Sequence, residues 1–190
     1  MTTDPTRAMR FAYADPPYPG QSLKHYGDHP DYAGEVDHAA LVDRLCDEYT
    51  DGWALSTGAK WLREVLLLCP EDVRVLSWVK TDAPPFTIRV QFSWEPVILR
   101  GGRPFEGGPR STRDSLVAPS TGAMGAGVHR DGPGHVVGRK PPRFCRWVFN
   151  CLGAEPGDAL DDLFPGSGAV GREWDRFTAQ GSLLAGGGDA

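Results

Sequence analysis

The sequence lacks any run of about 18 consecutive apolar residues, the length that a membrane-spanning helix requires. Its first residues also lack the apolar middle segment of a signal peptide. We therefore expect a cytoplasmic protein that does not contact a membrane.

An excess of positive charge is missing as well. The chain holds 20 lysines and arginines against 25 aspartates and glutamates, and its net charge is -5. Overall charge does not favour binding to nucleic acid, so any such role needs a local basic patch.

The four cysteines (Cys46, Cys69, Cys145, Cys151) show no Cys-x-x-Cys spacing. Apolar neighbours favour free, buried thiols in a reducing compartment. His25 and His29 lie four residues apart in a loop containing Pro and Gly, which does not favour a metal site, and we expect no metal. No Ser-His or Cys-His set for nucleophilic catalysis is visible.

What the sequence has is an alternation of short apolar strands and amphipathic helices. With 190 residues it has the length of one domain with a real core. Strands and helices joined by short links predict a mostly parallel sheet covered by helices. The expected strands are 9–14, 53–57, 73–79, 95–99, 114–118 and 159–164, and the expected helices are 35–50, 60–68, 143–152 and 172–177.

The first strand runs directly into the turn Asp15-Pro16-Pro17-Tyr18. Prolines cannot extend a strand ladder, so the strand ends here and the turn faces a cleft. A carboxylate and a rigid proline carbonyl can accept hydrogen bonds from an amino group, and a tyrosine ring can stack on an extruded base. Asp-Pro-Pro is also an ordinary turn, and this alternative stays open on the tetrapeptide alone.

From Gly101 to Gly138 the composition shifts to Gly, Pro, Ser and Arg. One interpretation is a flexible linker. The other is a loop that orders on a polyanion, with arginines contacting phosphates. The arginines of this stretch and its boundary are Arg103, Arg110, Arg113, Arg130 and Arg139; Lys24, in the segment after the Asp-Pro-Pro-Tyr turn, is a further candidate nucleic-acid contact.

Near the C-terminus the strand 159–164 leads into the turn 165–171, which is rich in glycine, and then into a helix. Glycines let the backbone approach a ligand closely, and amide groups at a helix start can hold a carboxylate. This order predicts a cofactor loop, with an acid, Asp162, at the end of the strand.

Taken together, these motifs resemble the β class of DNA amino-methyltransferases. The resemblance covers about Met9 to Phe177 and includes Trp78-Val79-Lys80 and Glu95-Pro96-Val97-Ile98-Leu99 in the middle. The first half, with Lys24-His25-Tyr26, is also similar to the adenine methyltransferases whose motif is Asp-Pro-Pro-Trp. The resemblance implies a single Rossmann-like α/β domain with one antiparallel strand, in a circularly permuted order with the catalytic half first. It also implies the cofactor S-adenosylmethionine and adenine in DNA as the substrate.

The same resemblance implies roles for individual residues. Asp15 and the Pro16 carbonyl would accept the hydrogens of the target amine, with Pro17 completing the turn, and Tyr18 would stack on the flipped base. The residues that match the family's cofactor-binding segments are Asp162, Phe164, Gly166, Ser167, Gly168, Lys140 and Pro141.

The expected organisation is one domain, 1–190. It comprises a catalytic half (9–100), a Gly/Pro/Arg-rich loop for target recognition (101–139), a cofactor half (140–178) and a flexible tail (179–190). The family's strand that carries a ribose-binding acid has no counterpart after the glycine-rich turn. Two alternatives therefore remain: a nucleic-acid-binding protein of this fold that needs a partner subunit, with a homodimer as one form, and an amino-methyltransferase for RNA or a small molecule.

Overall fold

In the computed structural model, the described residues are 7–20, 34–82, 89–105, 111–120 and 139–185. They form a single six-stranded sheet whose strands lie in the order β5-β3-β4-β2-β1-β6. The strands are β1 (Arg10–Ala14), β2 (Gly52–Ser56), β3 (Arg74–Lys80), β4 (Trp94–Gly101), β5 (Ser115–Ala118) and β6 (Ala159–Asp162). The helices are α2 (His38–Glu48), α3 (Leu62–Leu66), α4 (Pro142–Cys151) and α5 (Ala169–Ala185).

The direction of the strands agrees with the expectation of a mostly parallel sheet. β1 runs parallel to β2 and β6, and β3 runs parallel to β5. β4 is inserted between β2 and β3 and runs antiparallel to both. We call the end of the sheet where the five parallel strands finish the carboxyl end, and the opposite end the amino end.

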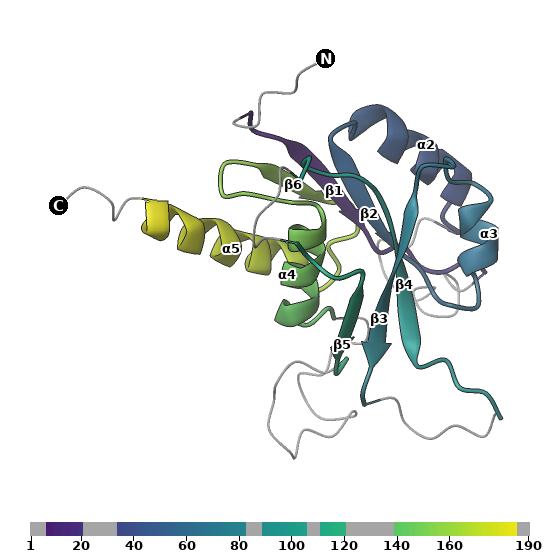
Figure 1. Cartoon of the computed structure of the whole chain (residues 1–190). Helices are drawn as coiled ribbons and strands as arrows, with labels where there is room; N and C mark the ends of the chain where they lie inside the picture. The colour runs from purple at the N-terminus through teal and green to yellow at the C-terminus, as the bar shows by residue number, and fades with distance from the viewer. Residues whose placement is uncertain (1–6, 21–33, 83–88, 106–110, 121–138, 186–190) are drawn as a thin grey trace.

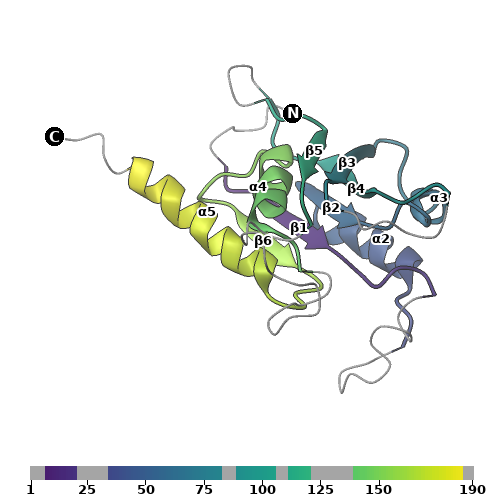
Figure 2. The same ribbon diagram turned by 90° about the horizontal axis from the view of Figure 1, so that it is seen from below.

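Helices cover the sheet from both sides, which gives three layers (Figures 1 and 2). On one face, α4 and α5 pack on buried aromatic residues, with Phe144 against Trp78 and Phe149 against Trp174. On the other face, α2 and α3 pack on β1, β2 and β4 through a second cluster that contains Leu45, Trp53 and Ile98. The burial of these large apolar side chains is the main stabilising contribution to such a fold.

Local sequence explains where α2 begins. The Asp37 side chain accepts a hydrogen bond from the Ala40 amide at 3.0 Å and thereby caps the helix. Such a cap satisfies one of the amide groups that a helix leaves unpaired at its start. The predicted helix 35–50 is therefore found, three residues shorter at its N-terminal end.

The last helix corrects a prediction. The sequence predicted a short helix over 172–177 and a flexible tail from residue 179, whereas α5 begins at Ala169 and continues to Ala185. Trp174 and Phe177 pack against Phe149 of α4 and anchor the helix, so that helical structure extends through residues that sequence composition assigned to a tail.

The segment 101–139 is also less uniform than predicted. Its residues 115–118 form β5, which pairs with β3 in the main sheet, as the possible strand at 114–118 anticipated. Residues 106–110 and 121–138 lie outside the described residues. No helix in the described part of the chain is long and apolar enough to span a membrane.

Candidate active site

The Asp15-Pro16-Pro17-Tyr18 turn follows β1 directly and lies at the carboxyl end of the sheet. β1 itself is almost completely buried, and its neighbour β6 is paired with it in register, with Tyr13 opposite Asp162. The backbone amide of Leu163 donates to the Tyr13 carbonyl at 2.9 Å. The Asp15 turn and the glycine-rich turn after β6 therefore leave the sheet side by side, although almost 150 residues separate them in the sequence.

Asp15 lies in a buried cluster of charged groups. Its Oδ1 atom is 3.0 Å from the Lys140 ammonium, which is only 7% exposed and also contacts Glu95 Oε1 at 2.5 Å. The second oxygen of Glu95 binds the Lys80 ammonium at 2.7 Å. Two carboxylates and two ammonium groups thus form a continuous row: Asp15, Lys140, Glu95 and Lys80.

Aromatic rings line one side of this row. The Lys80 ammonium is 4.6 Å from the centre of the Trp78 ring, and the Lys140 ammonium is 5.5 Å from the centre of the Phe144 ring. The negative face of an aromatic ring attracts a cation at these distances. The rings thereby help to hold both ammonium groups in place beside the carboxylates.

The pKa values of the cluster follow from burial and from the neighbouring charges. Burial raises the pKa of Asp15 to about 6, with Lys140 opposing and Glu95 adding to this effect. For Glu95, burial is outweighed by Lys140 and Lys80, which lower its pKa. For Lys140, burial is outweighed by the Asp15 and Glu95 carboxylates, which raise its pKa well above its usual range.

Tyr18 lies against a second aromatic ring. Its ring centre is 5.0 Å from that of Trp61, with the planes tilted by 36°. Gly58 makes this packing possible, because a Cβ atom there would lie 2.6 Å from the Trp61 ring and 3.1 Å from the Tyr18 ring. Burial and the nearby Glu95 charge raise the pKa of the Tyr18 hydroxyl, so it stays protonated.

The glycine-rich turn after β6 has the features of a ligand-binding loop. Gly166 and Gly168 adopt positive φ angles of 46° and 68°, which L-residues with side chains rarely take. Asp162 Oδ1 accepts a 3.4 Å hydrogen bond from the Phe164 amide, whereas Asp162 Oδ2 is buried without a partner among the described residues. Burial raises the pKa of Asp162, partly offset by that hydrogen bond.

Of the remaining residues predicted to bind the cofactor, two belong to this turn and two lie at the start of α4. Phe164 is partly buried against the cluster on the α2 side of the sheet, and Ser167 is partly buried just before α5. Pro141 is buried and precedes α4, where its carbonyl accepts from the amides of Phe144 and Cys145. Lys140, predicted to belong with Pro141 to the segment that closes over the cofactor, has its ammonium in the Asp15 cluster.

Two arginines predicted to contact nucleic acid lie away from this site. Arg103 is paired with the buried carboxylate of Asp158 at 2.6 Å and also donates to the Arg7 carbonyl, at the amino end of the sheet. Arg113 precedes β5, at that same end, and its carbonyl accepts from Trp147. The structure therefore does not bring them next to Asp15, and Arg103 holds the fold together there. Lys24 and Arg110 lie outside the described residues.

Sequence reasoning missed several residues of the site. In the sequence, Glu95 and Lys80 stand out only as parts of a resemblance, Gly58 lies between the expected strand 53–57 and helix 60–68, and Trp61 lies inside that helix. The available sequence signals are a lysine at the end of one strand and a glutamate at the start of the next. Neither signal shows that the two side chains contact each other. The four cysteines are free thiols, as predicted, but only Cys145 is buried, and the other three are partly exposed. No group of metal ligands is found among the described residues.

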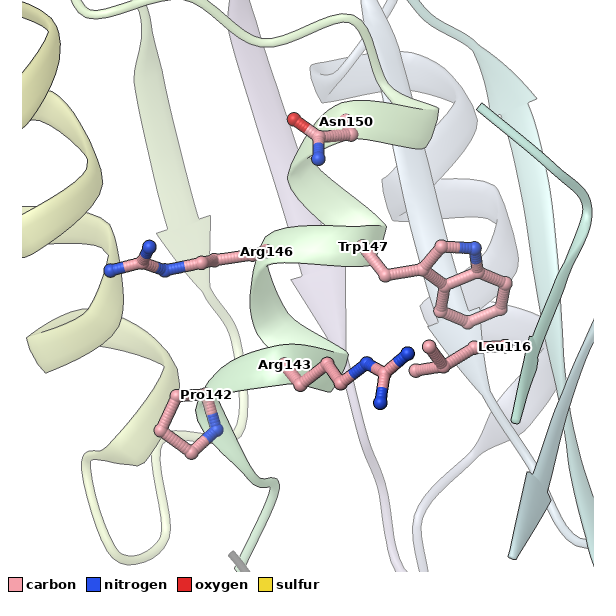
Figure 3. A pocket seen from close by; sticks show the side chains of 6 residues that line it. All are labelled: Leu116, Pro142, Arg143, Arg146, Trp147 and Asn150. Carbon is pink, nitrogen blue, oxygen red and sulfur yellow. The ribbon is translucent and has the colours of Figure 1, made fainter. Parts of the chain in front are cut away.

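A shallow hollow of about 460 Å³ lies between α4 and β5 (Figure 3). Leu116 and Trp147 form its apolar wall, and Arg143 points toward Leu116 across it. Arg146 turns the other way, toward α5, where it pairs with Glu173. None of the predicted site residues lines this hollow.

Comparison with solved structures identifies the fold. The structure of M1.HpyAVI in complex with SAM has a TM-score of 0.59 and 14% sequence identity, covering 90% of this chain and 79% of that chain. A second structure of M1.HpyAVI has a TM-score of 0.52 and 10% identity, covering 90% and 77%. The structure of a putative DNA modification methylase from Thermus thermophilus has a TM-score of 0.43 and 10% identity, covering 91% of this chain and 90% of that chain.

No protein-family model and no curated protein matches the sequence. The structural likeness confirms the α/β methyltransferase fold that the sequence motifs implied. At this level of identity the likeness concerns the fold alone, and function depends on the residues at the carboxyl end of the sheet.

Proposed function

We propose that the protein transfers a methyl group from S-adenosylmethionine to the exocyclic amino group of adenine in DNA. The observation that carries this proposal is the parallel pairing of β1 with β6, which sets the Asp15 turn beside the glycine-rich turn. A methyl donor held by one turn and an amine held by the other would then lie next to each other. Ligands of open α/β sheets bind at the carboxyl ends of the strands, as this arrangement requires.

The end of β6 and the turn after it fit the cofactor. The buried Asp162 oxygen that has no partner among the described residues is an acceptor available to a ligand. Gly166 and Gly168 open the backbone to close approach, and α5 starts directly after them. When bound there, S-adenosylmethionine supplies an electrophilic methyl group. M1.HpyAVI, which shares the fold, has been solved with SAM.

Asp15 and the Pro16 carbonyl prepare the amine. The nitrogen of an aromatic amine is a weak nucleophile because its lone pair is delocalised into the ring. Two fixed acceptors favour the pyramidal form and stabilise the positive charge that develops as the new N–C bond forms. S-adenosylmethionine bound beside the amine would supply the methyl group and keep the electron pair of its carbon–sulfur bond, and Asp15 would accept the proton that the nitrogen releases. Above a pH of about 6 the Asp15 carboxyl is ionised and can accept it.

Tyr18 serves as the platform for the flipped base. One side of its ring is backed by Trp61, which limits its movement and leaves the other side to stack on a base. The adenine preference comes from the resemblance of this turn to the adenine methyltransferases.

The test is a calorimetric titration of the purified protein with S-adenosylmethionine, followed by methyl transfer to duplex DNA. We expect micromolar binding of the cofactor and transfer to adenine-containing DNA. A duplex with hypoxanthine in place of adenine, which lacks the amino group, is the control and should accept no methyl group. Absence of cofactor binding would overturn the proposal and favour a nucleic-acid-binding protein that needs a partner subunit; transfer to RNA alone would change the substrate.

A further inference from the structure

Glu95 is the centre of the charged cluster at the carboxyl end of the sheet. Its side chain is 4% exposed, and each of its two oxygens binds a different lysine. One of these lysines, Lys140, continues to Asp15. Glu95 also adds its charge to the surroundings of Tyr18. A single buried carboxylate thus acts on both residues to which the proposed function gives a direct contact with the substrate.

The elements that supply these groups explain why the cluster is fixed. Asp15 follows β1, Lys80 ends β3, Glu95 lies on β4, and Lys140 precedes α4. β4 pairs with β3 so that Glu95 lies opposite Trp78, and the Lys80 amide donates to the Ser93 carbonyl at 2.8 Å. The lysines therefore reach Glu95 from the ends of rigid elements, and a change at Glu95 must be felt by Asp15 through Lys140.

We propose that Glu95 is a positioning residue that holds the Lys140 ammonium against Asp15 Oδ1, and that Glu95 and Lys80 together set the charge state of Asp15. The ammonium occupies one oxygen of Asp15 and leaves the other to the substrate amine. The inference rests on the proposed function, in which Asp15 receives that amine. It adds two residues, Glu95 and Lys80, that have no contact with the substrate in that proposal.

The charges around Asp15 give opposite expectations for the two residues. The described titratable groups that face it are Lys140, Glu95, Lys80, Tyr13 and Tyr18. The negative charge of Glu95 raises the pKa of Asp15, and the positive charge of Lys80 lowers it. Removing the charge of Glu95 should therefore let Asp15 ionise at lower pH, and removing that of Lys80 should delay its ionisation to higher pH.

The experiment follows the Asp15 carboxyl directly by carbon NMR during a pH titration of the protein without substrate. Asp15→Asn assigns the signal. Glu95→Gln keeps an oxygen that can accept from the Lys140 ammonium, so it removes the charge and retains the position of Lys140. We expect the midpoint to move down by about one pH unit in Glu95→Gln and up in Lys80→Met, the size typical of losing one nearby charge. A purely structural role would move both midpoints the same way or neither of them.

Glu173→Gln is the matched control, because Glu173 is also buried and paired with two cations, Arg146 and Arg176, but lies on α5. It should leave the Asp15 midpoint unchanged. If Glu95→Gln does not fold, Lys80→Met carries the test, since Lys80 is more exposed. The inference would be overturned if the Asp15 midpoint shifted in the same direction in Glu95→Gln and Lys80→Met, or no more than in Glu173→Gln.

Kinetics separate this inference from the proposed function. If methyl transfer occurs, the acid limb of its pH profile should move with the NMR midpoint in each variant, with kcat affected and cofactor affinity retained. If the wild-type protein transfers no methyl group to any amine, the proposed function fails, and the NMR titration still decides whether Glu95 and Lys80 govern Asp15.

Discussion

At the amino end of the sheet, arginines pair with carboxylates from different segments of the chain, and most of these pairs reach solvent. Arg7 binds Asp51, and Arg100 binds Asp72. At the carboxyl end, the two central groups, Glu95 and Lys140, are buried and bind each other, and each has a second partner of opposite charge. The ion pairs at the amino end therefore connect segments of the chain, whereas those at the carboxyl end place buried charges beside the proposed substrate site.

Unsatisfied polar atoms reinforce this difference. Thr57 Oγ1 and Asp162 Oδ2 are buried without hydrogen-bond partners among the described residues, and both follow or end strands at the carboxyl end. Buried polar atoms usually have partners, and an exception calls for a functional reason. Asp158, at the amino end, is satisfied by Arg103 and by the amides of Met9 and Glu155. Among the described residues, the amino end leaves one donor without a partner, Trp53 Nε1, whereas the carboxyl end leaves two acceptors that a ligand could use.

Of the substitutions considered, Asp15→Asn should have the largest effect. It tests whether the carboxyl end of the sheet carries the proposed activity. We expect methyl transfer to fall by about 100-fold or more, because a neutral amide accepts the amine proton poorly. Cofactor affinity, measured by calorimetry, should stay within about twofold, because Asp15 faces the amine. A variant that methylates at the wild-type rate would contradict the role given to Asp15.

Replacing Arg103 by Met should destabilise the packing at the amino end of the sheet. The Asp158 carboxylate would remain buried without its cation, so we expect the free energy of unfolding to fall by about 2 to 3 kcal/mol. Urea denaturation measures this loss. Arg113→Met is the control and should leave stability unchanged, since the hydrogen bonds at this residue go to its carbonyl. A loss equal in both variants would show that Arg103 has no special structural role.

Replacing Asp162 by Asn should separate binding from folding at the carboxyl end. The cofactor would lose a charged acceptor, so we expect its Kd to rise about tenfold, or about 1.4 kcal/mol. The thermal unfolding temperature should not fall, because burial already disfavours the charge of Asp162. Asp161→Asn is the matched control: Asp161 binds Arg10 and Tyr49, so that change should affect stability and spare the cofactor. The reverse pattern would remove Asp162 from the cofactor site.

Replacing Arg100 by Gln should have the smallest effect. Its ion pair with Asp72 is largely exposed, and such pairs contribute about 0.5 kcal/mol or less. The small loss should vanish in high salt, because exposed charges are screened. Urea denaturation at low and high salt measures it. A loss as large as that of Arg103→Met would show that exposure does not distinguish the pairs at the amino end.

Local sequence was sufficient for most of the elements. The strands and helices at 53–57, 73–79, 95–99, 114–118 and 143–152 are found within about three residues of their predicted bounds. Periodicity and turn residues decide such short elements, and both are properties of neighbouring residues. Helix α5 is the exception, since its length depends on packing against Phe149.

The sequence by itself determined that an acidic turn follows a buried strand, that a glycine-rich turn precedes a helix, and that the chain forms an α/β sheet. Only the tertiary structure decided that β4 enters between β2 and β3, that β6 lies beside β1, and that Lys140 meets Asp15. It also decided that Arg103 lies at the amino end of the sheet. Turns and strands follow from residues that are adjacent in the chain, whereas the pairing of strands and of buried charges depends on how distant segments pack, which local sequence does not encode.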